Sequence, residues 1–250
     1  MKNPLADPYT LGVSSGSALG AVFVIFFGVS ILGKMTLPII SIAAGFITLI
    51  CVISFAKMVH RQMSVETIIL TGIIFSSFLG SLISLMIALT GEELRQIISW
   101  LLGSVSMRGW EYVRLIIPFF VIGTIILMLN RRELNALSFG EETAKYLGVN
   151  IQTRKMFILL GASLLTGSAV AVSGTIGFVG LVIPHLVRLA WGADHKQLLP
   201  LACICGGAFL IIADLLARTV IAPTEIPIGV ITALIGGPVF GLILLRAKKA

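Results

Sequence analysis

Eight long apolar runs determine what this chain can fold into. A helix needs about 20 apolar residues to cross the hydrocarbon core of a bilayer, because each residue adds about 1.5 Å along the helix axis. The runs cover residues 11–32, 37–56, 67–90, 115–130, 156–172, 175–190, 198–217 and 226–245. Since 57% of the 250 residues are hydrophobic and only 12% are charged, we expect one all-α, polytopic transmembrane domain over residues 1–250.

Glycine and proline positions predict how some of these helices pack. The sixth run is interrupted by Gly177, Gly180 and Pro184, and irregular backbone at membrane depth is tolerated only against protein or a water-filled cavity. We therefore expect this run to be buried in the bundle. A four-residue repeat in the first run predicts a close contact between helix backbones, and its members are Gly12, Gly16 and Gly20.

The positive charges predict the orientation in the membrane. A net charge of +7 in a soluble chain would suggest nucleic acid, but here the cations lie in short loops between apolar runs, so topology explains them better. Thirteen fall on one side: Lys2, Lys57, Arg61, Arg131, Arg132, Lys145, Arg154, Lys155, Arg188, Lys196, Arg246, Lys248 and Lys249. Five fall on the other: Lys34, Arg95, Arg108, Arg114 and Arg218. The excess predicts that both termini and residues 131–155 are cytoplasmic.

Residues 131–155 are the longest polar stretch of the chain. Their centre, GEETAKYLG at 140–148, begins and ends in glycine, and Glu141 and Lys145 stand four residues apart. This spacing favours a short amphipathic helix bounded by turns. A polar helix between two spans is well placed to dock on a soluble partner; the alternative is a solvated connector with no partner.

Residues 91–110 predict a short interfacial helix on the outer surface. The stretch is too polar at its ends to span, and one apolar face would be made by Ile97, Ile98, Trp100, Leu101 and Leu102. A loop anchor and a gate are both compatible with this pattern.

Few polar side chains occur within the spans. Asp214 and Arg218 are spaced to form an i,i+4 ion pair, which either snorkels to the outer surface or contacts an outer partner. One face of the third span could line a polar, uncharged path or could form hydrogen bonds to neighbouring helices. Its serines are Ser76, Ser77, Ser81 and Ser84.

The residue patterns of enzymes are missing from the sequence. Residues 28–35 nearly match a phosphate-binding loop, but Met35 cannot ligate magnesium. The three histidines are far apart, and the C-x-C at Cys203 and Cys205 is not a zinc spacing, so we predict no catalytic residue and no metal site. Energy for transport would then come from another subunit or from an ion gradient. The span centres hold almost no ionisable residues, which favours another subunit, and an ion-coupled secondary transporter is the alternative.

Four stretches occur in the order found in a known family. They are residues 3–16 (NPLADPYTLGVSSG), 140–149 (GEETAKYLGV), 174–188 (GTIGFVGLVIPHLVR) and 225–240 (EIPIGVITALIGGPVF). Together they resemble the FecCD-type permeases, the membrane subunits of type II ATP-binding-cassette (ABC) importers for iron siderophores, haem and cobalamin. The resemblance covers the whole chain and implies the permease fold of that family, which has ten helices.

This resemblance implies a set of partners. The chain would pair with a second copy or a sister permease in the bilayer, two cytoplasmic ATPase subunits and an outer substrate-binding protein. ATP and Mg²⁺ would bind to the ATPase, so the resemblance implies no cofactor in this chain, and no nucleic acid. The cargo would be an iron-siderophore-type chelate, or alternatively cobalamin or haem, crossing the cytoplasmic membrane of a bacterium or archaeon.

The resemblance also assigns residues. Residues 131–155 match the family's coupling region, which sits in a cleft of the ATPase, and the matching positions are Gly140, Glu141, Glu142, Thr143, Ala144, Leu147 and Gly148. The translocation path and its gates match Asn3, Leu5, Ser64, Val65, Glu66, Ser76, Ser77, Thr90 and Gly91. Arg218 matches an outer region that receives acidic residues of the binding protein.

The start of the chain departs from the family pattern. The motif at residues 3–8 follows the second helix in family members, so two N-terminal spans are expected to be missing. We expect a fragment or a mis-started sequence here; a shortened permease is the alternative.

Overall fold

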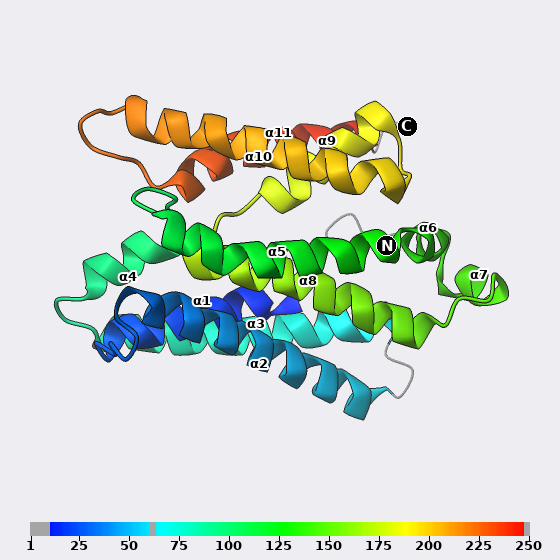
Figure 1. Ribbon diagram of the computed structural model, residues 1–250, viewed down its shortest axis with the longest axis horizontal. Coiled ribbons are helices and arrows are strands. Elements are labelled where there is room, and N and C mark those ends of the chain that lie inside the picture. Colours follow the sequence, from blue (N-terminus) through cyan, green and yellow to red (C-terminus); the bar gives the residue numbers. More distant parts are fainter. Residues whose placement is uncertain (1–10, 61–63, 248–250) are drawn as a thin grey trace.

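The computed structural model describes residues 11–60 and 64–247, and every apolar run forms a helix (Figure 1). The eight helices are α1 (Val13–Phe26), α2 (Thr36–Val59), α3 (Val65–Leu89), α5 (Trp110–Leu129), α8 (Ile151–Ser173), α9 (Val179–Trp191), α10 (His195–Thr219) and α11 (Ile228–Ala247). Five of these helices are long and apolar enough to cross a membrane, namely α2, α3, α5, α8 and α10, while α1, α9 and α11 are shorter apolar helices. No strand occurs among the described residues, so the predicted all-α membrane fold is confirmed.

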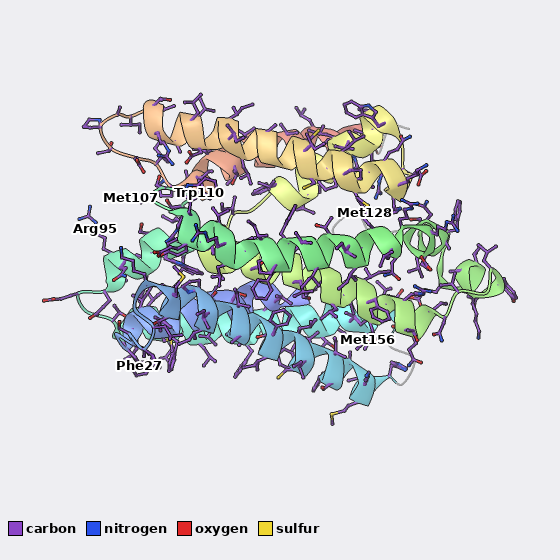
Figure 2. The ribbon with its side chains drawn as sticks, in the orientation of Figure 1. Phe27, Arg95, Met107, Trp110, Met128 and Met156 are labelled. Atoms are coloured by element: carbon purple, nitrogen blue, oxygen red, sulfur yellow. The ribbon has the colours of Figure 1, made fainter. Side chains whose placement is uncertain are left out.

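Four short elements complete the fold. They are the 3₁₀ turn η2 (Gly33–Met35) and the helices α4 (Leu94–Leu101), α6 (Arg131–Ser138) and α7 (Glu141–Tyr146). Figure 1 shows α6 and α7 at one end of the molecule and α4 at the opposite end. Figure 2 places Arg95, Met107 and Trp110 at the α4 end. We call the two ends the α6–α7 end and the α4 end.

The helices α1 to α5 pack with α8 into what we call the N-terminal block. α1 lies closely against α2, because a Cβ atom at Gly20 would come within 2.6 Å of the Ala44 Cβ, and one at Gly16 would overlap the Thr48 hydroxyl. The predicted close contact of backbones is confirmed at these two glycines. The block's main apolar cluster combines α1, α3, α4 and α8 and consists of Ala18, Ala21, Val22, Ile25, Ile83, Ile97, Trp100 and Val170.

α4 departs from the helix expected over residues 91–110. Ile97 is fully buried and Trp100 is 8% exposed, so both side chains insert into the block, whereas Ile98 and Leu102 are 43% and 40% exposed. The expectation of a single apolar face that includes all five of its residues was therefore wrong. α4 is a short helix inserted into the bundle. Successive residues of a helix are rotated by about 100° around its axis, so Ile97 and Trp100 lie on the side that faces the bundle, and Ile98 and Leu102 lie outside that side.

The last three helices form a second layer, the C-terminal block, in which α10 packs on α9 and α11 (Figure 1). Residues 174–178, which join α8 to α9, are not helical, so the predicted irregularity is present at Gly177, whereas Gly180 and Pro184 lie within the helix α9. The expectation that this run is buried was only partly right. Val182, Ile183 and Val187 are buried, but Leu186 and Leu189 are 41% and 69% exposed.

Candidate functional site

The two short helices α6 and α7 bear the polar side chains of the stretch between α5 and α8 (Figure 1). α7 starts after Gly140 and is followed by Gly148, and these glycines have φ angles of +113° and +80°. Ala144 is fully buried, whereas Tyr146 and Leu147 are 90% and 66% exposed. The predicted short helix between two glycine turns is therefore present, with Ala144 as its buried residue. Its exposed face also carries Glu142 and Thr143.

The carboxylate of Glu141 connects α7 to two membrane helices. Its Oε2 lies 2.6 Å from Nζ of Lys155 in α8, and its Oε1 accepts a 3.3 Å hydrogen bond from the backbone N–H of Val65, the first residue of α3. Lys155 is only 5% exposed, so water screens this ion pair little on the lysine side. Lys145, four residues beyond Glu141, stays exposed. We call Glu141, Val65 and Lys155 the α7 joint.

The residues predicted to form a cytoplasmic gate stand at the start of α3. Ser64 caps the helix, because its Oγ accepts a 3.2 Å hydrogen bond from the N–H of Thr67. Val65 belongs to the α7 joint, and Glu66 is exposed in the first turn. The predicted gate and the predicted coupling helix therefore touch each other.

Three of the four candidate path serines on α3 share an exposed face, and Ser76 does not. Ser77, Ser81 and Ser84 follow each other at spacings of four and three residues and are all exposed. Ser81 donates a 3.0 Å hydrogen bond to the carbonyl of Ser77 within its own helix. Ser76 is partly buried, and its Oγ has no hydrogen-bond partner among the described residues.

The remaining gate residues lie elsewhere. Thr90 ends α3, and its hydroxyl donates a 2.7 Å hydrogen bond to the carbonyl of Met86. Gly91 is exposed in the bend that follows. Asn3 and Leu5 lie outside the described residues.

Asn135 of α6 connects the polar end to the C-terminal block. Its Oδ1 accepts a 2.9 Å hydrogen bond from the backbone N–H of His195 and lies 2.6 Å from His195 Nδ1, while its Nδ2 donates a 2.8 Å hydrogen bond to Asp194 Oδ1. Asp194 also caps α10 by accepting from the N–H of Lys196 at 3.0 Å. The Lys196 N–H first, and then the Asn135 amide, lower the pKa of the Asp194 carboxyl below its ordinary value. We call Asn135, Asp194 and His195 the α6 joint.

A second polar cluster holds α6 against α8. Nη1 of Arg154 lies 3.3 Å from Oε1 of Glu133 and donates a 3.0 Å hydrogen bond to Oδ1 of Asn130. Asn130 is 4% exposed, and its amide donates a 2.8 Å hydrogen bond to the carbonyl of Ile126 in α5. α6 is thereby fixed to both of the helices that flank the polar stretch.

At the α4 end, the predicted i,i+4 ion pair is present. Arg218 Nε lies 2.9 Å from Asp214 Oδ2, with the arginine side chain 43% exposed. Close by in sequence, Glu225 accepts a 2.6 Å hydrogen bond from the hydroxyl of Ser106, which joins the loop after α4 to the loop before α11.

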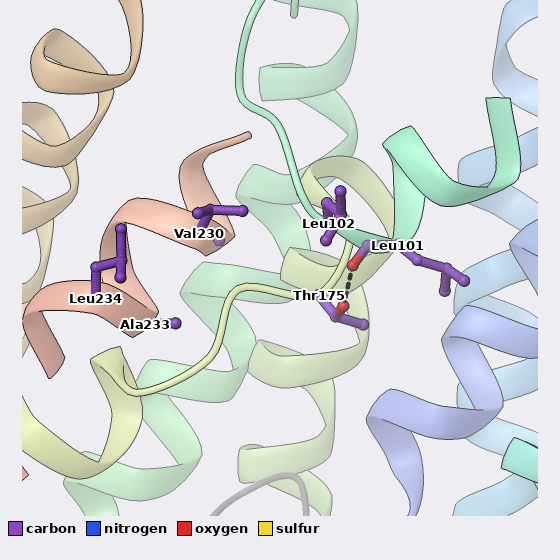
Figure 3. Close-up of a pocket in the computed structure, with 7 residues that line it drawn as sticks. Leu101, Leu102, Thr175, Val230, Ala233 and Leu234 are labelled. Carbon is purple, nitrogen blue, oxygen red and sulfur yellow. Dashed lines mark hydrogen bonds between the residues drawn. The ribbon is translucent and has the colours of Figure 1, made fainter. Parts of the chain in front are cut away.

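The two blocks also meet at backbone carbonyls of α4 (Figure 3). The hydroxyl of Thr175 donates a short hydrogen bond to the carbonyl of Leu101, and the N–H of Gly229 donates a 3.2 Å hydrogen bond to the carbonyl of Leu102. Both carbonyls belong to the last turn of α4, where a helix has no partners of its own. We call this contact the α4 joint, and it comprises Leu101, Leu102, Ser104, Ser173, Gly174, Thr175 and Gly229.

Two open hollows flank the α4 joint. One of about 460 Å³ lies toward α11, and one of about 340 Å³ lies toward α1 and α3. They share Leu101 and Thr175, and the hydrogen bond between these two residues is drawn at the first hollow in Figure 3. Both hollows are lined almost entirely by apolar side chains and by hydroxyls, with no charged group.

Known proteins resemble the chain along its whole length. A model described as the FecCD transport family matches residues 1–246. An uncharacterized ABC transporter permease of Bacillus subtilis, YvrB, is 62% identical over 100% of this chain and 71% of its own length. The cobalamin import system permease BtuC of Halobacterium salinarum is 40% identical over 99% of this chain and 66% of its own length. A solved structure, described as an inward-facing conformation of a metal-chelate type ABC transporter, has a TM-score of 0.87 and 39% identity over 98% of this chain and 77% of that one.

Proposed function

Because the chain belongs to the FecCD transport family and is a multi-pass permease of the ABC importer type, we propose that it carries an iron-siderophore-type metal chelate across the cytoplasmic membrane of a bacterium or archaeon. The energy comes from ATP hydrolysis in two separate cytoplasmic ATPase subunits, which bind the ATP and Mg²⁺. This chain supplies the translocation path and the coupling region through which the ATPase subunits open and close that path.

The observation that carries the proposal is the position of Glu141. A force applied to α7 from outside the membrane acts on the first N–H of α3 through one carboxylate oxygen and on the buried ammonium of Lys155 through the other. α3 bears the candidate path residues, so a displacement of α7 tilts the helix that lines the path. Such a displacement switches the permease between outward-facing and inward-facing states.

The ATPase docks on the exposed face of the coupling region. Phe139, Tyr146 and Leu147 are 70%, 90% and 66% exposed, and in the sequence they lie on either side of Ala144, the buried residue of α7. Large apolar side chains gathered on a polar segment are typical of a protein contact. Glu142 and Thr143 supply the polar rim of the same surface.

The path runs along the serine face of α3, between this chain and a second copy or a sister permease. Hydroxyl groups on that face suit a polar chelate, because they can replace part of its hydration without carrying a net charge. The exposed serines at positions 77, 81 and 84 support this assignment.

The orientation follows from the positive charges. The loop cations at the α6–α7 end outnumber those at the α4 end, so the α6–α7 end and both termini face the cytoplasm. The binding protein then docks at the α4 end, where an acidic residue of that protein competes with Asp214 for the exposed guanidinium of Arg218.

Cobalamin and haem are the alternative cargoes. The relative from Halobacterium salinarum is named for cobalamin, and the solved structure is described by metal chelates in general. All three cargoes are large metal complexes, so the same path chemistry serves each of them.

Uptake assays test the proposal directly. We expect source cells that lack the gene to lose uptake of radiolabelled ferric siderophore, and radiolabelled cobalamin assayed in parallel decides between the two cargoes. We expect Glu141→Lys, or deletion of residues 140–148, to abolish ATP-driven uptake while the protein still inserts into the membrane. Normal uptake in both variants would contradict the proposal, and uptake that collapses with an ionophore but survives ATP depletion would favour an ion-coupled transporter.

A further inference from the structure

The C-terminal block has its own apolar core. One cluster joins α10 to α11 through Ala213, Ala217, Ile228 and Ile231, and another joins α9 to α10 through Ile183, Val187 and Leu198. The clusters of the N-terminal block are built from α1, α2, α3, α4 and α8. Because the buried residues of the two blocks fall into separate clusters, each block can move as a unit against the other.

At the α6–α7 end, α6 packs against α10 and is connected to it by Asn135. Both ends of the Asn135 amide are used: the oxygen faces the N–H of His195, and the nitrogen faces the carboxylate of Asp194. A side-chain amide held at two points fixes the distance between α6 and the first turn of α10, and it also fixes the rotation of that turn. The carboxylate makes one of these hydrogen bonds charge-assisted, which strengthens it.

We propose that Asn135 is a positioning residue that makes the C-terminal block follow the coupling region during transport. This inference rests on the proposed function and extends it, because the α7 joint reaches only α3 and α8, whereas Asn135 reaches α10. In this arrangement α6 and the first turn of α10 keep a fixed separation while the ATPase cycles. α10 has 25 residues and is therefore about 37 Å long, so a shift of its first turn becomes a tilt of the block about the α4 joint.

Spin-label distance measurements test the fixed separation in the complete transporter, in nucleotide-free and ATP-bound states. The labels stand at the exposed positions Ser138 and Gln197, in a chain whose three native cysteines are replaced by alanine. We expect the same label distance in both states, and a shifted or broadened distance in the ATP-bound state of Asn135→Ala. A wild-type distance that changes between the states, or an Asn135→Ala distance identical to wild type, would overturn the proposal.

A polarity swap separates the contact from a general loss of folding. Asn135→Asp places two carboxylates face to face, so we expect the uptake per ATP hydrolysed to fall about five-fold or more. Adding Asp194→Asn to that variant restores one amide facing one carboxylate, and we expect the double variant to recover uptake per ATP. Gln197→Ala is the matched control, since it removes an exposed amide beyond the joint, and it should leave the ratio unchanged. If the double variant is no better than Asn135→Asp, the contact does not carry the coupling.

The two proposals fail differently. If the chain is not the permease of an ATPase-driven importer, the wild-type complex itself will show no ATP-dependent uptake. If only the role of Asn135 is wrong, wild-type uptake and its dependence on Glu141 remain, and Asn135→Asp retains the wild-type ratio of uptake to hydrolysis.

Discussion

At the α4 end, the two blocks meet at backbone carbonyls of α4 and at the hydrogen bond between Ser106 and Glu225, whereas at the α6–α7 end they meet through the polar side chains of the α6 joint. The α4 joint places the N–H of Gly229 and the hydroxyl of Thr175 on the last carbonyls of α4. The α6 joint uses the amide of Asn135 and the carboxylate of Asp194, and this carboxylate is largely exposed.

This difference indicates different mechanical roles. A shift at the α4 joint would leave the last carbonyls of α4 without their partners, because these carbonyls have no partner within their own helix. The side chains of the α6 and α7 joints connect different helices instead, so a displacement on one side of these contacts is passed to the other side. We therefore infer that the α4 joint is a pivot and that the joints of α6 and α7 transmit the movement.

Breaking the pivot should have the largest effect. Gly174 has φ +71° and ψ −165°, a conformation that essentially only glycine adopts, and a Cβ there would overlap the carbonyl of Trp100. The backbone strain alone costs about 1–3 kcal/mol, so we expect Gly174→Ala to lower the melting temperature of the purified protein by ~5 °C or more. Gly206→Ala in α10 is the control, because no atom lies within 4 Å of its added Cβ. Equal melting temperatures for the two variants would contradict the assignment of a rigid pivot.

Breaking the α7 joint from its two sides should give unequal effects. Glu141→Gln leaves the buried ammonium of Lys155 facing a neutral amide, whereas Lys155→Met removes that charge and leaves a carboxylate that is 37% exposed to water. Removing one partner of a buried pair is more costly when the remaining charge is the buried one. We expect Glu141→Gln to reduce stability by ~1–3 kcal/mol and Lys155→Met by less, as measured by denaturant titration in detergent.

The matching functional measurement is ATP-driven uptake. Both substitutions remove the ion pair, so both should lower uptake, and only the stability difference should depend on which partner is lost. If Lys155→Met were the more destabilising variant, the different burial of Lys155 and Glu141 would not explain the stability of this ion pair.

The sequence predicted the helices well because hydropathy reflects the membrane itself. All eight apolar runs are helices, but their bounds differ from the runs: α5 begins at Trp110, before the run at 115, and α9 begins at Val179, after the run at 175. α5 extends beyond its apolar run into polar residues, and α9 starts late because residues 174–178 leave the helix to contact α4. The spacing of apolar residues predicts neither of these two helix boundaries.

The site could be predicted only where its residues are close in sequence. The glycines around α7 and the Asp214–Arg218 pair are local patterns, and both are present. Asn135 and Lys155 were missed as functional residues, because their partners lie 59 and 14 residues away and are brought near only by helix packing. α4 was misjudged for a related reason, since burial of Trp100 depends on α1, which no pattern within 91–110 contains.

Changing the charge of the α6 joint, without removing its hydrogen bonds, should have the smallest effect. In Asp194→Asn the side-chain oxygen still caps α10 and still accepts from Asn135, so at neutral pH we expect a melting temperature close to that of wild type. The pKa of Asp194 is lowered in the folded protein, so its charge stabilises the fold fully above the ordinary value of 3.8 and loses that effect as the pH falls through the lower, folded value. The difference in melting temperature between wild type and Asp194→Asn should therefore stay constant from pH 8 to about pH 5 and change only in stronger acid. A difference that already disappears between pH 7 and pH 6 would mean that a group other than this carboxylate controls the joint.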